Sequence, residues 1–274
     1  MDSFRDAMGA YSGDPEQNLL FFRVIVFFYA SLNLYLDLQP RHYGWQNGMF
    51  FAKYTHWVEA AIVLYFGLAI STHFAPELQN LQNLRVISFA ALLPMTVYLD
   101  IGFFVAVYPV RILTGKEGGP FLSPTSWHKH LLNLGWVIGD ALMMECAARH
   151  TPGRGSFHTN GDVPSVTLPW VSVNVIPYVF NVAYLVLAWL IRYKPTGLFI
   201  FRMIGNPIIP GVFRVAPGLW IYGAFGLWPI QVLHVISPRY ICTPLAHMML
   251  AWCASASPEV VQRFLFVMVG ATPF

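Results

Sequence analysis

Charged side chains are scarce in this chain. Of its 274 residues only 11% are charged, whereas 56% are hydrophobic, and the mean hydropathy is +0.53. So little charge excludes an ordinary soluble domain and is typical of a protein with several membrane spans. The formal net charge of +3 is small and spread along the chain, without a basic stripe that contains aromatic residues. Nucleic acid is therefore not an expected partner.

Cysteines and recognisable catalytic motifs are also few. The three cysteines, Cys146, Cys242 and Cys253, do not form a disulfide framework, and two of them lie in apolar runs where a thiol packs as a small hydrophobe. The sequence has no clustered-histidine pattern, no G-x-S-x-G and no H-E-x-x-H. Their absence argues against the common membrane oxygenases, serine hydrolases and zinc proteases. We expect no metal and no cofactor.

Long apolar runs predict an all-α bundle in a membrane. Six stretches are long and apolar enough to cross it as helices. They are residues 18–38, 49–71, 85–109, 127–148, 168–191 and 217–236. The residues before the first run are polar and include four acids. This composition is typical neither of a signal peptide nor of a mitochondrial presequence, so we expect a non-cleaved membrane protein.

The C-terminal part differs from the six runs. Its two apolar pieces, 244–253 and 257–270, are too short to cross about 30 Å of hydrocarbon. We expect interfacial helices or a surface for a partner, unless the two pieces join into one bent seventh span. The predicted organisation is a polar N-terminal segment, a six-span bundle and a C-terminal extension, with the bounds 1–17, 18–237 and 238–274.

Three polar residues open the second span. The segment KYTHWVEAAIVLYFG carries Thr55, His56 and Glu59 in its first turns. Polar groups in hydrocarbon are costly and usually face the bundle interior, and spacings of three and four place these side chains on one helix face. One interpretation makes Thr55 a nucleophile activated by a carboxylate or an imidazole. The other has Thr55 bonded to its own helix beside a buried His56–Glu59 pair.

A depth count predicts one polar layer. We call side B the membrane face where the first and third spans end and the second and fourth begin. With a rise of 1.5 Å per residue, Thr55 and His130 lie within about 10 Å of side B, and Asn33 and Asp100 reach a similar depth from other spans. This layer predicts a polar pocket that a lipid headgroup or ester can reach.

Further polar residues occur in the first and fourth spans. His130 and Asn133 share a helix face, so the amide can orient the imidazole as a general base, although an interfacial histidine explains the spacing equally well. Asp140 lies deeper and requires a partner. Arg23, near one end of the first span, is expected to extend to the interface.

Thr55 is followed by an apolar helix, and His130 falls in the fourth span. At these positions the chain resembles the androgen-induced (FAR-type) membrane proteins, because Thr55 and its helix look like the second span of that family and the family carries its histidine in the fourth span. Other similar positions are Phe66-Gly67-Leu68, Tyr184 through Trp189, Thr196-Gly197 and Gly205-Asn206-Pro207. The resemblance covers about residues 18–237.

The resemblance implies six-span hydrolases of fatty-acid esters of hydroxy fatty acids. In that case Thr55 would be the nucleophile and His130 its base, with Asp100 or Glu59 orienting the base. The sequence around the histidine, HLLN, and the C-terminal extension depart from the family pattern. Both departures bear on whether catalysis is retained.

Two functions of different classes follow. The first is hydrolysis of a lipid ester, and the second, which we favour, is a non-catalytic accessory subunit that holds lipid in a larger membrane complex. The expected partners are membrane lipid and other membrane-protein subunits. The expected location is the mitochondrial inner membrane, with the endoplasmic reticulum as the alternative. A partner surface is expected on the C-terminal extension at Phe264, Leu265, Phe266 and Val267.

Overall fold

The computed structural model describes residues 14–39, 54–107, 128–150, 175–184 and 241–270. This part of the chain is helical and contains no strand, which confirms the predicted all-α class. Among its helices, four are long and apolar enough to cross a membrane, which indicates a membrane-embedded protein. The predicted fifth and sixth spans, 168–191 and 217–236, lie outside the described residues apart from 175–184.

The first spanning helix, α2 (Pro15–Leu38), begins with a well-formed cap. The side chain of Asp14 accepts a hydrogen bond of 2.9 Å from the backbone N–H of Glu16, and Pro15 occupies the first helical position. An acid at the cap and a proline that needs no hydrogen-bond acceptor are favourable in the first turn. The helix therefore begins before residue 18, where the apolar run begins.

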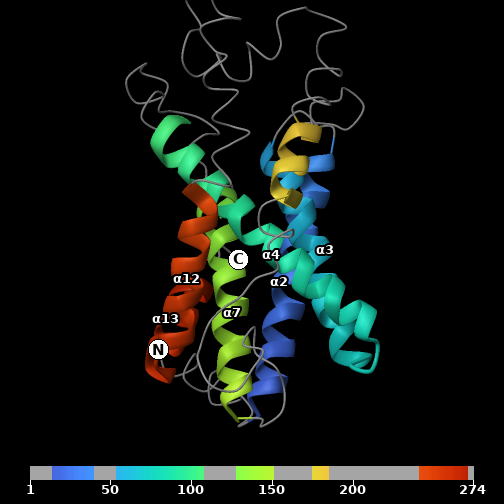
Figure 1. Ribbon diagram of the computed structural model, residues 1–274, viewed down its shortest axis with the longest axis vertical. Helices are drawn as coiled ribbons and strands as arrows, with labels where there is room; N and C mark the ends of the chain where they lie inside the picture. The colour runs from blue at the N-terminus through green and yellow to red at the C-terminus, as the bar shows by residue number, and fades with distance from the viewer. Residues whose placement is uncertain (1–13, 40–53, 108–127, 151–174, 185–240, 271–274) are drawn as a thin grey trace, which may run out of the picture.

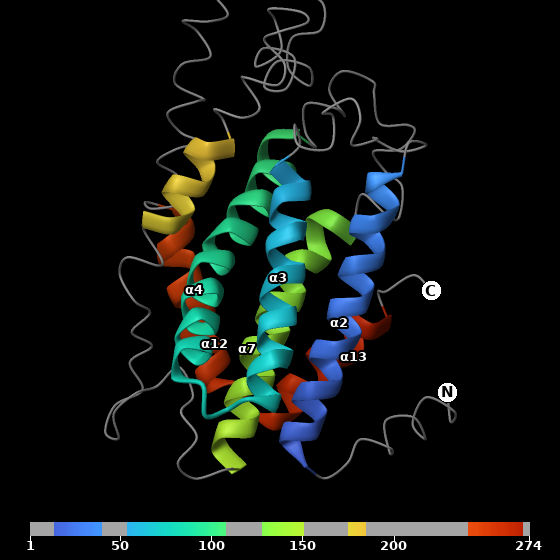
Figure 2. The same ribbon diagram turned by 90° about the vertical axis from the view of Figure 1, so that its right-hand side faces the viewer.

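The spanning helices lie side by side along the long axis of the bundle (Figure 2). After α2 come α3 (Tyr54–Phe74), α4 (Gln79–Ile101) and α7 (Asn133–His150). Helix α2 packs against α3 and α7, and α4 packs against the same two helices from the other side. The apolar window of Lys129–Ala148, which is mostly α7, is 72% buried, whereas that of α2 is only 28% buried. Helix α7 is therefore a central helix, and α2 presents most of its surface to the surroundings.

Two π-helical segments lie at side B. One, η2 (Gly102–Val107), continues α4, and the other, η4 (His128–Leu132), leads into α7. Such wide turns are uncommon and often accompany functional sites. Both segments bring ring-bearing residues to the end of the bundle where the sequence predicts the polar layer.

Glycines allow other helices to approach α7 closely. A Cβ atom at Gly139 would lie 2.8 Å from the ring of Phe22 on α2, and one at Gly135 would collide with the side chain of Met268. Because the Phe22 ring is buried in a close-packed core, a methyl group at Gly139 would force the ring to shift. Gly139 therefore allows α2 to approach α7 closely, whereas at Gly135 the contacted atoms are the end of the flexible Met268 side chain, which can move away.

The C-terminal extension forms two short helices, α12 (Thr243–Ser255) and α13 (Pro258–Gly270), of 13 residues each. Both pack against α7 (Figure 1), and each is about 20 Å long. Phe264, predicted to face a partner, packs partly buried against the core, whereas Val267 is 64% exposed. The side chains of Leu265 and Phe266 lie outside the described part of the structure.

Candidate functional site: two clusters of ionisable side chains

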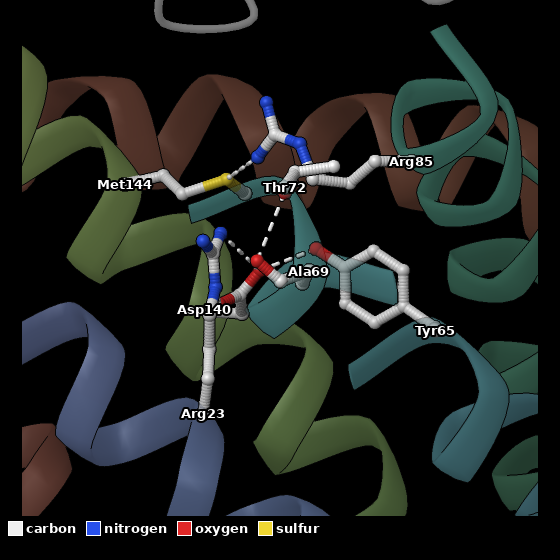
Figure 3. Close-up of polar contacts among 7 residues, drawn as sticks. All are labelled: Arg23, Tyr65, Ala69, Thr72, Arg85, Asp140 and Met144. Atoms are coloured by element: carbon white, nitrogen blue, oxygen red, sulfur yellow. Dashed lines mark hydrogen bonds and ion pairs between the residues drawn. The ribbon is translucent and has the colours of Figure 1, made fainter. Parts of the chain in front are cut away.

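A buried ion cluster joins three of the spanning helices. Arg23 on α2 donates from Nε to Asp140 Oδ1 on α7 at 2.6 Å and from Nη2 to Oδ2 at 3.2 Å. The hydroxyl of Tyr65 on α3 donates to the same carboxylate (Figure 3). The side chains of Arg23 and Asp140 are 5% and 0% exposed. We call this group the Arg23–Asp140–Tyr65 cluster.

Asp140 has the partner that its burial requires. The expectation that Arg23 extends to the membrane interface is wrong. Instead of extending to the interface, Arg23 turns inward and is 4% exposed. A guanidinium in hydrocarbon is costly, and Asp140 supplies two acceptor oxygens for its fork of N–H groups. Removing either partner would leave an uncompensated buried charge, so the two residues form one structural unit.

A second arginine lies beside this cluster. Arg85 on α4 donates from Nη1 to the thioether sulfur of Met144 on α7 at 3.0 Å, as Figure 3 shows. Its Nε is buried and has no hydrogen-bond partner among the described residues. The charges of Arg23 and Asp140 both act on Arg85. The region therefore holds two cations and one anion.

A second ion cluster lies near side B. His56 Nε2 on α3 lies 3.3 Å from Asp37 Oδ2 on α2, and the ammonium of Lys129 in η4 contacts the same oxygen. The side chains of these residues are 1%, 7% and 12% exposed, respectively. We call this group the Asp37–His56–Lys129 cluster. The pairing differs from the sequence interpretation, because His56 contacts Asp37 and not Glu59.

Glu59 lies one turn further into the membrane than His56. It is 1% exposed, and neither carboxylate oxygen has a hydrogen-bond partner within the described part of the chain. Lys129 and Asp37 both act on it electrostatically. Glu59 is therefore a buried acid beside the Asp37–His56–Lys129 cluster that takes no part in the ion pairs of that cluster.

The pairing of the proposed nucleophile Thr55 with the proposed base His130 stays a prediction. Thr55 is half-buried. The His130 ring stacks on Phe103 of η2, with ring centroids 3.8 Å apart and planes at 8°. Asp100, one turn before Phe103, is 7% exposed, and its Oδ1 has no partner among the described residues.

The two asparagines predicted for the polar pocket bond to their own helices. Asn33 Nδ2 donates to the carbonyl of Tyr29 at 3.0 Å, and Asn133 Nδ2 donates to the carbonyl of Lys129 at 2.8 Å. Such bonds satisfy a polar side chain without a neighbouring helix. The Asn133 amide donor is thus directed to the backbone of η4.

An aromatic cluster at side B was not anticipated from the sequence. The Tyr54 hydroxyl donates to Asn181 Oδ1 at 2.6 Å, and the Tyr54 ring meets Tyr98 and Tyr184 edge-on at centroid distances of 5.4 and 5.1 Å. Aromatic pairs in this geometry are favourable, and a buried tyrosine hydroxyl needs a partner. The cluster attaches the helix Val175–Tyr184 to α3 and α4.

Within the described residues, no group of three His, Cys, Asp or Glu side chains could hold a metal ion. Comparison of the chain with protein-family models, with curated proteins and with solved structures found no match. The function is therefore argued from the contacts of the chain itself.

Proposed function

We propose that the chain is a lipid-holding accessory subunit of a larger membrane complex. The observation that carries the proposal is that buried charged side chains form ion pairs between helices. Arg23 and Asp140 pair across α2 and α7, and Asp37 pairs with groups on α3 and η4. Ionisable groups in membrane helices that pair with one another hold the helices together, and this is the role that these paired residues have. The buried acids Glu59 and Asp100 are not paired in this way among the described residues.

The apolar exterior supports the same proposal. Helix α2 carries a row of large exposed side chains, namely Phe21, Phe28, Leu32 and Tyr35. A surface of this kind is stable only against acyl chains or the apolar face of another subunit. Val267 on α13 adds an exposed position on the predicted partner surface.

The test uses the tagged full-length chain extracted in a mild detergent. We expect it to migrate on native electrophoresis with other subunits in fixed stoichiometry and to carry lipid. Thr55→Ala should assemble as the wild type does, as should the control Thr96→Ala, whose hydroxyl bonds its own helix through the Leu93 carbonyl at 2.8 Å. A wild-type chain that migrates alone and free of lipid would contradict the proposal.

The membrane in the proposal is the mitochondrial inner membrane, with the endoplasmic reticulum as the alternative. Fractionation of cells that express the tagged chain distinguishes the two. Co-purification with inner-membrane markers is the expected result, and co-purification with endoplasmic-reticulum markers would shift the proposal to the alternative.

Hydrolysis of a fatty-acid ester by Thr55 is the second candidate, and one observation favours it. His56, the neighbour of Thr55 in the chain, has its imidazole 3.3 Å from the Asp37 carboxylate, and a carboxylate that fixes an imidazole is part of many nucleophilic sites. A fluorophosphonate probe decides between the candidates. Labelling that Thr55→Ala abolishes and Thr96→Ala leaves intact would establish the hydrolase and remove the purely accessory role.

A further inference from the structure

The region around Arg85 has more positive than negative charge. Arg23 and Arg85 contribute two guanidiniums, Asp140 contributes one carboxylate, and Tyr65 donates its hydroxyl to that carboxylate. Asp140 already receives two hydrogen bonds from Arg23. Arg85 is left with the Met144 thioether at 3.0 Å, and a thioether is a weak acceptor.

Acidic side chains nearby do not supply the missing charge. Glu145 follows Met144 in the chain and is buried, but it is not among the groups that act electrostatically on Arg85. The groups that act electrostatically on Arg85 are Tyr65, Arg23 and Asp140, and its buried Nε lacks a partner within the described residues. A guanidinium in the membrane needs an anion or a route to water.

The depth of Arg85 suits a lipid headgroup. It lies six residues after the first residue of α4, Gln79, which is about 9 Å along the helix axis. A side chain as long as arginine spans part of that distance, and membrane phosphates lie at the same face. Arginine is also the side chain best matched to the oxygens of a phosphate, which it binds with two parallel N–H groups.

We propose that Arg85, supported by the charge of Arg23, binds the phosphate of an anionic phospholipid at the membrane face opposite side B. The proposal rests on the lipid-holding role proposed above and names the lipid class. The lipid phosphate supplies the second anion of the cluster, and its acyl chains lie along the exposed apolar surface of the bundle. The thioether of Met144 then packs beside the guanidinium.

The experiment measures binding of phosphatidylglycerol to the purified full-length protein in detergent, by native mass spectrometry and by the shift in melting temperature on titration. Arg85→Gln should weaken binding about tenfold, because it removes a charge-assisted pair. The control Arg263→Gln alters an exposed arginine of α13 and should bind as the wild type does. Arg85→Lys keeps the charge but loses the two parallel N–H groups, so its affinity for phosphatidylglycerol should lie between those of Arg85→Gln and the wild type. This variant tests the site if Arg85→Gln does not fold.

The remaining arms identify the ligand. Phosphatidylglycerol should raise the melting temperature more than phosphatidylcholine, and inorganic phosphate at the same concentration should leave it unchanged. The proposal would be overturned if inorganic phosphate raised the melting temperature as much as phosphatidylglycerol does. It would also be overturned if Arg85→Gln and Arg263→Gln lost the same affinity for phosphatidylglycerol. If the wild type binds lipid and both Arg85 variants bind as much, the Arg85 site is wrong while the proposed lipid-holding role stands. If the wild type holds no lipid, the proposed function fails with it.

Discussion

The Arg23–Asp140–Tyr65 cluster and the Asp37–His56–Lys129 cluster each join three helical elements, but they differ in burial and in composition. The first places its charges where the side chains are 5% and 0% exposed. The second includes Lys129 at 12% exposure and lies beside Glu59, which has no hydrogen-bond partner among the described residues. Arg23 and Asp37 lie about 21 Å apart along α2.

The difference indicates how much each cluster contributes to the stability of the protein. Charges that cannot reach water depend entirely on one another, so the loss of one partner is costly. Charges near the membrane face can move toward water when a partner is lost. We therefore expect the Arg23–Asp140–Tyr65 cluster to determine stability and the Asp37–His56–Lys129 cluster to tolerate change.

The largest effect is expected from Asp140→Ala. The variant leaves Arg23 buried without a carboxylate, and the free energy of unfolding should fall by about 3–5 kcal/mol. Circular dichroism during unfolding in detergent and SDS measures it. Glu259→Ala, an exposed acid in the first turn of α13, is the control and should change stability by less than about 0.5 kcal/mol. A loss below about 1 kcal/mol in Asp140→Ala would mean that Arg23 does not depend on Asp140.

The next effect concerns the packing that brings the first cluster together. In Gly139→Ala the new methyl group would lie 2.8 Å from the Phe22 ring, which must shift, at a cost of about 1–3 kcal/mol. In Gly102→Ala the new methyl group meets no atom within 4 Å. The same unfolding assay compares the two, and equal stability would show that α2 and α7 adjust freely.

A smaller loss is expected at side B. Asp37→Asn removes the charge that pairs with His56 and Lys129, yet Lys129 can turn toward water. The free energy of unfolding should fall by about 1.5 kcal/mol, clearly less than in Asp140→Ala. If the two variants lose the same amount, the contrast between the clusters is wrong.

The smallest effect is expected from Tyr65→Phe. It removes one hydroxyl from the Asp140 carboxylate and keeps the ring and both charges, so a loss of about 1 kcal/mol is expected. Tyr35→Phe alters a tyrosine of α2 that is 60% exposed and is the matched control. If Tyr65→Phe lowered the free energy of unfolding as much as Asp140→Ala, the hydroxyl and not the ion pair would be the main source of the stability of the cluster.

Within the described residues, four of the six apolar runs correspond to helices long enough to cross a membrane, but most of their ends differ from the predicted ones. The first run ends at residue 38, where α2 ends, because hydropathy follows burial in lipid. The helix begins three residues before this run, because the Asp14 cap and Pro15 are polar or neutral residues that hydropathy does not detect. The π-helical turns around 102–107 and 128–132 carry no signature that hydropathy can detect.

The depth count placed polar residues in a single layer near side B. It could not predict which charged side chains pair with each other. Arg23 and Asp140 are 117 residues apart, and nothing local links them. A signal was present nevertheless, since Arg23 and Asp140 are charges of opposite sign inside apolar runs and lie about 12–15 Å from the same face. Lys129 was overlooked because lysines at helix ends are usually solvated. Thr55 and His130 remain predictions for a site whose chemistry the described contacts do not test.

The most direct test of the account is a double-mutant cycle on Arg23 and Asp140, measured by unfolding of the full-length chain in detergent. The ion pair of Arg23 and Asp140 is expected to hold α2 against α7. Arg23→Met and Asp140→Leu should each be strongly destabilising, while the double variant regains most of the loss, giving a coupling energy of about 3 kcal/mol. A coupling energy below about 0.5 kcal/mol would contradict the account, because the two charges would then act independently of each other.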